Sequence, residues 1–147
     1  KYMLQASDKD VTIVIPFDNK VLDIWKAEGN DATTLSKLQN EIDILEPQGG
    51  TDIYTPLVTA MDEISKYNVN DYTTSIILMS DGKSNGGSIQ DVENKWNSSS
   101  LDIPIFSITF GDSDDRELQD LADFSKARVF DGKKDLEKAF KQAKGYN

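Results

Sequence analysis

The sequence contains no cysteine and no histidine, and it has no long apolar run. Without cysteine the chain can form neither disulfides nor thiolate metal sites, and it has no cysteine nucleophile. Without histidine it cannot build a Ser-His-Asp hydrolase site or the commonest zinc sites. Any bound metal must therefore be held by oxygen, which favours magnesium, manganese or calcium. Because no apolar segment reaches the ~18 residues that mark a membrane span, the sequence predicts no such span in this chain.

Positive charge is also scarce. The chain has 16 basic residues against 26 acidic ones, which gives a net charge of −10. Such a surface repels phosphate, so we expect neither nucleic acid nor an anionic membrane as a partner. Acidic solubility is the simplest explanation of the charge. The length of 147 residues and the hydrophobic content of 37% suit one globular domain, 1–147, with a real core.

The hydrophobic pattern alternates between two periods. Short β-branched and apolar runs predict strands at 11–17, 21–25, 75–79, 103–110 and 128–130. Helical spacing predicts helices at 31–46, 56–64, 88–96, 114–126 and 136–143, with Asn30 or Asp31 capping the first and Ser88 the third. A short turn separates the first two strands, so they are expected to pair antiparallel. The alternation predicts an α/β, Rossmann-like fold, with a mostly parallel sheet flanked by helices on both faces.

Two loops each present an oxygen-bearing side chain where an element begins or ends. The segment "GGTD" (49–52) precedes a predicted helix, and Asp81 directly follows the strand at 75–79. Taken alone, each is an ordinary turn or helix cap. In parallel sheets, however, ligands gather beyond the carboxyl ends of the strands, and both loops are expected at that edge. We therefore expect the two loops to be neighbours in space.

Five blocks of the sequence, in order, resemble a known family. They are "DVTIVIPFDNKV", "GGTDIYTPLVTAM", "IILMSDG", "IPIFSITFGD" and "RVFDGKKDLEKAF", which together span nearly the whole chain. The sequence is similar in these blocks to a von Willebrand factor A (vWA) domain of bacterial type. The pair "GGTDIY" and "ILMSDG" is the more specific part of this resemblance.

The resemblance implies a metal-ion-dependent adhesion site (MIDAS), in which a divalent ion lies above the sheet. In the family its ligands come from Asp-x-Ser-x-Ser after the first strand, from a threonine and from an aspartate. Thr51 matches the threonine and Asp81 the aspartate, with Asp52 and Ser84 as supporting groups behind the ligands. The implied cofactor is Mg²⁺, or Mn²⁺ or Ca²⁺. Neutral hydroxyl ligands keep the ion electrophilic, so that it can accept a carboxylate from a partner protein.

The sequence departs from the family at the first motif, because Asp-x-Ser-x-Ser does not occur in it. The nearest approach is Asp123, Ser125 and Ala127, which lacks the last hydroxyl. We therefore expect an N-terminally incomplete domain, without the first central strand, that binds metal weakly or not at all. Strands 11–17 and 75–79 would flank the lost strand and expose unpaired edges. A separate segment, or a swapped copy of the chain, would have to supply it.

The resemblance implies a protein-binding module of the adhesion or scaffold type that is not an enzyme. Two alternatives stay open. One is a phosphoryl-transfer or receiver-like α/β domain with Asp81 as nucleophile or magnesium ligand, for which Asp18, Asp112 and Lys83 are further candidates. The other is a structural vWA domain whose metal site is dead.

Overall fold

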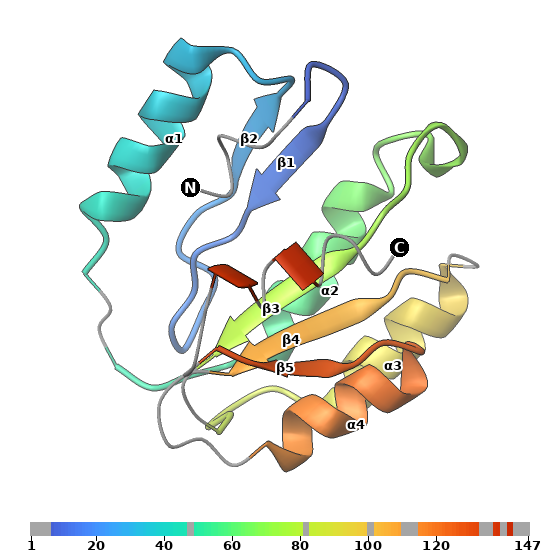
Figure 1. Ribbon diagram of the computed structural model, residues 1–147. Coiled ribbons are helices and arrows are strands. Elements are labelled where there is room, and N and C mark those ends of the chain that lie inside the picture. The colour runs from blue at the N-terminus through green and yellow to red at the C-terminus, as the bar shows by residue number, and fades with distance from the viewer. Residues whose placement is uncertain are drawn as a thin grey trace.

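The computed structural model describes residues 7–46, 49–80, 83–99, 102–109, 115–132, 137–138 and 141–142. Its elements, in chain order, are β1 (Val11–Val14), β2 (Trp25–Glu28), α1 (Ala32–Asp43), α2 (Tyr54–Ile64), the 3₁₀ helix η2 (Val69–Asp71), β3 (Ile76–Ser80), α3 (Ile89–Ser98), β4 (Ile105–Thr109), α4 (Arg116–Phe124) and β5 (Val129–Asp131). Figure 1 shows two groups of strands with helices packed against them. The predicted α/β class is confirmed.

The larger sheet consists of three parallel strands in the order β3-β4-β5. The central strand β4 is buried along its whole length, as its apolar sequence predicts. Ser80 of β3 pairs with Thr109 of β4, so these two strands end together at one edge. This is the carboxyl edge where the sequence predicts a site.

The smaller sheet is the antiparallel pair β1–β2, in which Val11 lies opposite Glu28. The pairing was predicted, but β2 begins at Trp25 instead of spanning 21–25. Pro16 has no backbone N–H, so it cannot continue the ladder. Beyond it, Phe17 and Val21 form only an isolated bridge, and the residues between β1 and β2 make a long loop.

Three helices cover one face of the larger sheet. Apolar side chains of α2, α3 and α4 pack with those of β3 and β4 in the main core, which contains Ile53, Tyr54, Leu57, Met61, Ile76, Leu78, Val92, Ile103, Ile105, Leu118 and Leu121. A second cluster, on the other face, joins Phe106 and Ile108 of β4 to Phe130 of β5. The predicted last helix falls mostly outside the described residues. Its described parts, 137–138 and 141–142, are helical, and Lys141 Nζ lies 3.1 Å from Glu137 Oε1, one turn away.

Helix α1 covers the smaller sheet. Its inner side chains Leu35 and Leu38 pack against Ala27 of β2. Asp31 caps this helix as predicted, because its carboxylate accepts the Thr34 N–H at 3.0 Å.

The described residues form two separate sheets, and polar contacts link the segments around them. Among the described residues, no ladder joins β1 to β3, and in Figure 1 these strands run in similar directions in adjacent parts of the molecule. Near the carboxyl edge, the Asp52 N–H donates to the Asp18 carbonyl at 2.7 Å. Farther along, Lys26 Nζ of β2 lies 2.5 Å from Glu63 Oε2 of α2.

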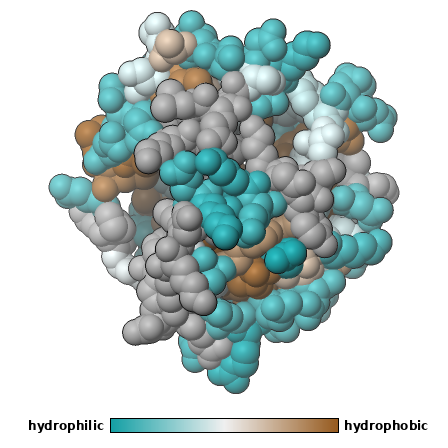
Figure 2. Space-filling model, viewed as in Figure 1, coloured by the Kyte–Doolittle hydropathy of each residue, from teal (hydrophilic) through white to brown (hydrophobic). Residues whose placement is uncertain are grey.

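The face of the molecule seen in Figure 2 is mainly polar where its residues are described. In Figure 2, hydrophilic residues dominate the visible face, and apolar side chains show only in separate places. This agrees with the net charge of −10. Within the described ranges, no helix has the length and apolar content needed to cross a bilayer.

Candidate functional site

The two loops singled out in the sequence are in contact. The Thr51 N–H donates to Asn85 Oδ1 at 3.1 Å, and the Asn85 N–H donates to the Thr51 carbonyl at 2.6 Å. These paired bonds join the segment before α2 to the segment after β3, at the carboxyl edge of the sheet. Asp81 itself lies outside the described residues.

The Thr51 side chain is half-buried. Both of its backbone polar groups are engaged by Asn85, whereas its hydroxyl has no hydrogen-bond partner among the described residues. A fixed backbone with a free hydroxyl is the arrangement that a neutral oxygen ligand requires.

Asp52, the next residue, is only 7% exposed and has a structural role. Its Oδ1 accepts the N–H groups of Tyr54 at 2.9 Å and of Thr55 at 3.1 Å, and its Oδ2 accepts the Thr55 hydroxyl. These are the unpaired donors at the start of α2, so the carboxylate caps the helix. Both oxygens are therefore engaged within the protein, as expected of a supporting group and not of a direct ligand.

Ser84 fixes the second loop. Its hydroxyl donates to the Gly86 carbonyl at 2.6 Å and accepts the Ile53 N–H at 3.3 Å. Gly87 is needed beside it, because its φ is +70° and a Cβ there would lie 2.5 Å from Asp52 Oδ1. The "SNGG" turn thus folds closely over the start of α2.

Glu117 of α4 also belongs to this site, although no motif in the sequence marks it. Its Oε2 accepts the Tyr54 hydroxyl at 3.0 Å and the Ser84 N–H at 3.1 Å. Burial, with this hydrogen bond, raises the pKa of the Tyr54 phenol, so that the phenol stays a donor. The side chains of Asn85 and Tyr54 were missed for the same reason: only the fold brings them to Thr51 and Glu117.

The donor set suits a hard cation. The side chains at this edge carry oxygen ligands and no sulfur or imidazole, and the Thr51 hydroxyl is free of protein partners in the described ranges. No group of three or more carboxylates that could hold a metal converges in the part of the chain that the structure describes. The described residues therefore include one hydroxyl without a protein partner, that of Thr51, and not a complete metal cage.

Of the candidates for phosphoryl transfer, the structure describes Asp18 and Lys83. The Asp18 carboxylate is buried and accepts the Lys20 N–H at 3.1 Å, and the Asp18 carbonyl accepts the Asp52 N–H. Lys83 is exposed. Asp112, like Asp81, falls in the portion that is not described.

The nearest approach to the family's first motif lies away from this site. Ser125 is buried, and its hydroxyl accepts the Ile105 N–H at 3.0 Å and donates to the Leu121 carbonyl at 2.8 Å. Ile105 begins β4, so Ser125 lies at the opposite end of that strand from Thr109. Asp123, exposed on α4, accepts a hydrogen bond from Gln119. Through Ser125, these hydrogen bonds connect the end of α4 to the start of β4.

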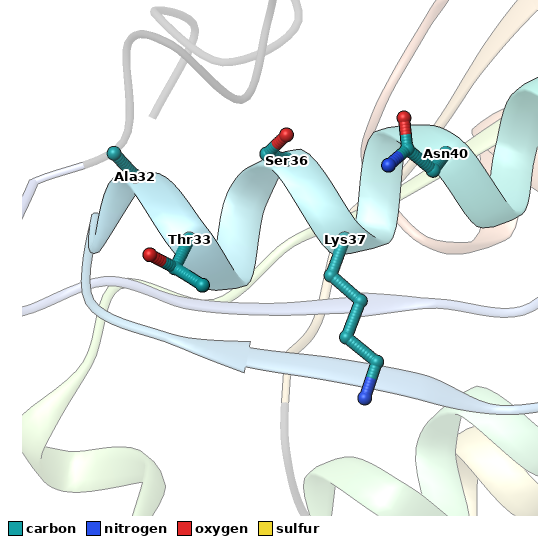
Figure 3. A pocket seen from close by; sticks show the side chains of 5 residues that line it. All are labelled: Ala32, Thr33, Ser36, Lys37 and Asn40. Atoms are coloured by element: carbon teal, nitrogen blue, oxygen red, sulfur yellow. The ribbon is translucent and has the colours of Figure 1, made fainter.

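Two surface hollows offer no better site. The larger, about 510 Å³, is lined by one face of α1: Ala32, Thr33, Ser36, Lys37 and Asn40. In Figure 3, Ser36 and Asn40 point to one side of the helix and Lys37 to another. The smaller hollow, about 390 Å³, has a mixed lining of Asp8, Lys9, Asp10, Val11, Glu28, Gly29, Asp71 and Tyr72. The described lining of the first holds no carboxylate, and that of the second does not form a metal-binding group.

Comparison with known proteins points to one family. The family model described as the von Willebrand factor type A domain matches residues 6–143. Among solved structures, the chain is similar to a von Willebrand factor type A protein from Catenulispora acidiphila. The TM-score is 0.71 and the identity 18%, and the match covers 88% of this chain but 31% of that one. An uncharacterized membrane spanning protein from Vibrio fischeri matches with a TM-score of 0.43 and 15% identity, over 95% of this chain and 77% of that one. No curated protein matches the sequence.

Proposed function

Because the chain belongs to the von Willebrand factor type A domain family, we propose that it is a non-catalytic module that binds a partner protein through a divalent cation. The family often mediates protein interactions through a MIDAS site, and its domains are generally not enzymes. In this proposal Thr51 and Asp81 are ligands of a magnesium ion, and Asp52 and Ser84 support them.

The observation that carries the proposal is the hydrogen bonding of Thr51. Its backbone is held by two hydrogen bonds to Asn85, while its hydroxyl has no partner within the described residues. A hydroxyl adds no charge to the coordination shell, so the ion it helps to hold stays electrophilic. When bound, the ion would supply a Lewis-acidic position for an oxygen of the partner. The protein residues hold the ligands still and keep their spacing.

The charge of the chain then sets the kind of partner. A protein of net charge −10 repels an acidic partner at long range. At contact distance the field of a divalent ion dominates, because salt screens close charges little. A single Asp or Glu of the partner, presented at the ion, would therefore bind where a broadly acidic surface would not.

Capture of short peptides by the full-length protein tests this proposal. Peptides with one glutamate in a neutral background are compared with the same peptides carrying glutamine, with Mg²⁺ and with a chelator. We expect capture that needs both the glutamate and the metal and that is lost in Thr51→Ala. Metal-independent capture by both peptide sets would contradict the proposal. Phosphorylation of Asp81 by acetyl phosphate, detected by mass spectrometry, would favour a phosphoryl-transfer domain instead.

We also propose that a further extended segment pairs between β1 and β3 in the working protein. The support is that these strands belong to different sheets in the described part of the chain and that Asp-x-Ser-x-Ser is missing from the sequence. Open strand edges are costly and prone to association. In the full-length protein, hydrogen exchange should show the β1 and β3 amides protected on both edges. Rapid exchange along either strand would refute the added pairing.

A further inference from the structure

The carboxylate of Glu117 joins three parts of the candidate site. It extends from α4, accepts the Tyr54 hydroxyl of α2 at 3.0 Å, and accepts the Ser84 N–H of the loop after β3 at 3.1 Å. We infer that Glu117 is a positioning residue, through which α4 sets the geometry of the cation site. This inference rests on the proposed function, because it concerns the same site.

The hydrogen bonds continue from Glu117 to Thr51, the proposed ligand of the cation. Ser84, held by Glu117, accepts the Ile53 N–H through its hydroxyl at 3.3 Å, and that hydroxyl oxygen lies 3.5 Å from the Thr51 carbonyl oxygen. Asn85, the next residue, holds both backbone groups of Thr51. The loop continues into Gly86 and Gly87, which lack side chains to anchor it. Glu117 is thus the anchor by which α4 holds this stretch.

The chemistry of the contact favours a carboxylate. Two donors converge on one oxygen, Oε2, and hydrogen bonds to an ionised acceptor are roughly twice as strong as neutral ones. Glutamine could present one oxygen at the same place, but without the charge. Alanine would leave the Tyr54 hydroxyl and the Ser84 N–H without this acceptor, in a half-buried setting where water is a poor substitute.

Positioning must be distinguished from the simple loss of a negative charge near a cation. Tyr54→Phe keeps the Glu117 charge and removes one hydrogen bond. Asp120→Asn removes a charge from the next turn of α4. Asp120 also acts on the Tyr54 phenol through its charge, but it has no part in the network, so it is the matched control.

The experiment measures Mn²⁺ affinity by isothermal titration calorimetry in the full-length protein, well below the unfolding temperature of every variant. We expect Glu117→Ala and Glu117→Gln to weaken Mn²⁺ binding by about tenfold or more, in the range seen for supporting groups of metal ligands. Tyr54→Phe should weaken it about threefold, since one neutral donor is lost. Asp120→Asn should stay within about twofold, because exposed charges are screened.

A second readout needs no metal. Hydrogen exchange of the amides at 83–87, followed without metal, should quicken about tenfold in Glu117→Ala, the effect of losing about 1.4 kcal/mol from a charged acceptor. If the parent protein does not bind Mn²⁺, the proposed function fails and exchange alone decides whether Glu117 anchors the loop. If the parent binds Mn²⁺ and exchange at 83–87 is unchanged in Glu117→Ala, the inference is overturned. It is equally overturned if Asp120→Asn weakens Mn²⁺ binding as much as Glu117→Gln.

Discussion

Replacing Asp52 by alanine tests the structural role assigned to this carboxylate. The buried side chain accepts the N–H groups of Tyr54 and Thr55 and the Thr55 hydroxyl. Alanine would leave the start of α2 uncapped at the point where the helix meets the loop containing Gly87. We therefore expect Asp52→Ala to lower the stability of the whole domain as well as disturb the site.

The magnitude follows from these contacts. Loss of a helix cap costs about 1–2 kcal/mol, and loss of the Thr55 hydroxyl bond adds about 1 kcal/mol. The free energy of unfolding should fall by about 2–3 kcal/mol, which for a domain of this size lowers Tm by about 5–10 °C. Asp52→Asn keeps one acceptor oxygen, so it should lower the free energy of unfolding by about half as much as Asp52→Ala does.

Urea unfolding, followed by tryptophan fluorescence and by circular dichroism, measures this change. The matched control is Ser88→Ala, which removes the cap of α3, where the Ser88 hydroxyl accepts the Gln90 N–H at 3.2 Å. This exposed cap should cost about 1 kcal/mol. The reasoning is refuted if Asp52→Ala costs no more than Ser88→Ala. It is also refuted if Asp52→Ala leaves stability unchanged but abolishes metal binding, because Asp52 would then be a ligand.

Two further predictions concern groups away from the site. Ser107 is fully buried in β4, and its hydroxyl has no hydrogen-bond partner among the residues that the structure describes. Ser107→Ala should therefore leave the free energy of unfolding unchanged or raise it by up to about 1 kcal/mol. A large fall in this free energy, measured by urea unfolding, would contradict the prediction. The hydrogen bond from Lys26, and then that from Lys66, lowers the pKa of Glu63 below its usual value of 4.5. This stabilisation is present above pH 4.5 and is lost as the pH falls through the lower, folded pKa, so Glu63→Gln should flatten the loss of stability below pH 4.5. If the free energy of unfolding falls with pH below 4.5 as steeply in Glu63→Gln as in the parent protein, the role assigned to Glu63 is contradicted.

The fold was predictable because its signals are local. The apolar runs at β3 and β4 mark buried strands, and Asp31 and Ser88 stand where a helix needs an acceptor. The error at β2 also has a local cause: apolar Leu22 looks like part of a strand, but Pro16 interrupts the ladder and leaves Leu22 exposed.

The site was only partly predictable. Thr51 and Ser84 stand in glycine-rich turns at element ends, a pattern that sequence reasoning recognises. Glu117 carries no such signal, because it lies on an ordinary amphipathic helix and is 63 residues from Tyr54, its partner. Asp52 is predicted from the sequence as a supporting group in a loop where aspartate commonly caps a helix, and its hydrogen bonds to Tyr54 and Thr55 show that it caps α2. Contacts of this kind depend on how helices cross the sheet, which periodicity does not specify.

The most direct test of the central claim compares Mn²⁺ affinity in the full-length protein with that of Thr51→Val and Thr51→Ser. Valine keeps the shape of threonine without its hydroxyl, and serine keeps the hydroxyl. Because this hydroxyl has no partner among the described residues, neither change should lower Tm by more than about 2 °C. We predict that valine weakens Mn²⁺ binding by about 10- to 100-fold and that serine restores most of the loss. Equal Mn²⁺ affinities in all three proteins would contradict the claim that the Thr51 hydroxyl is a ligand of the cation.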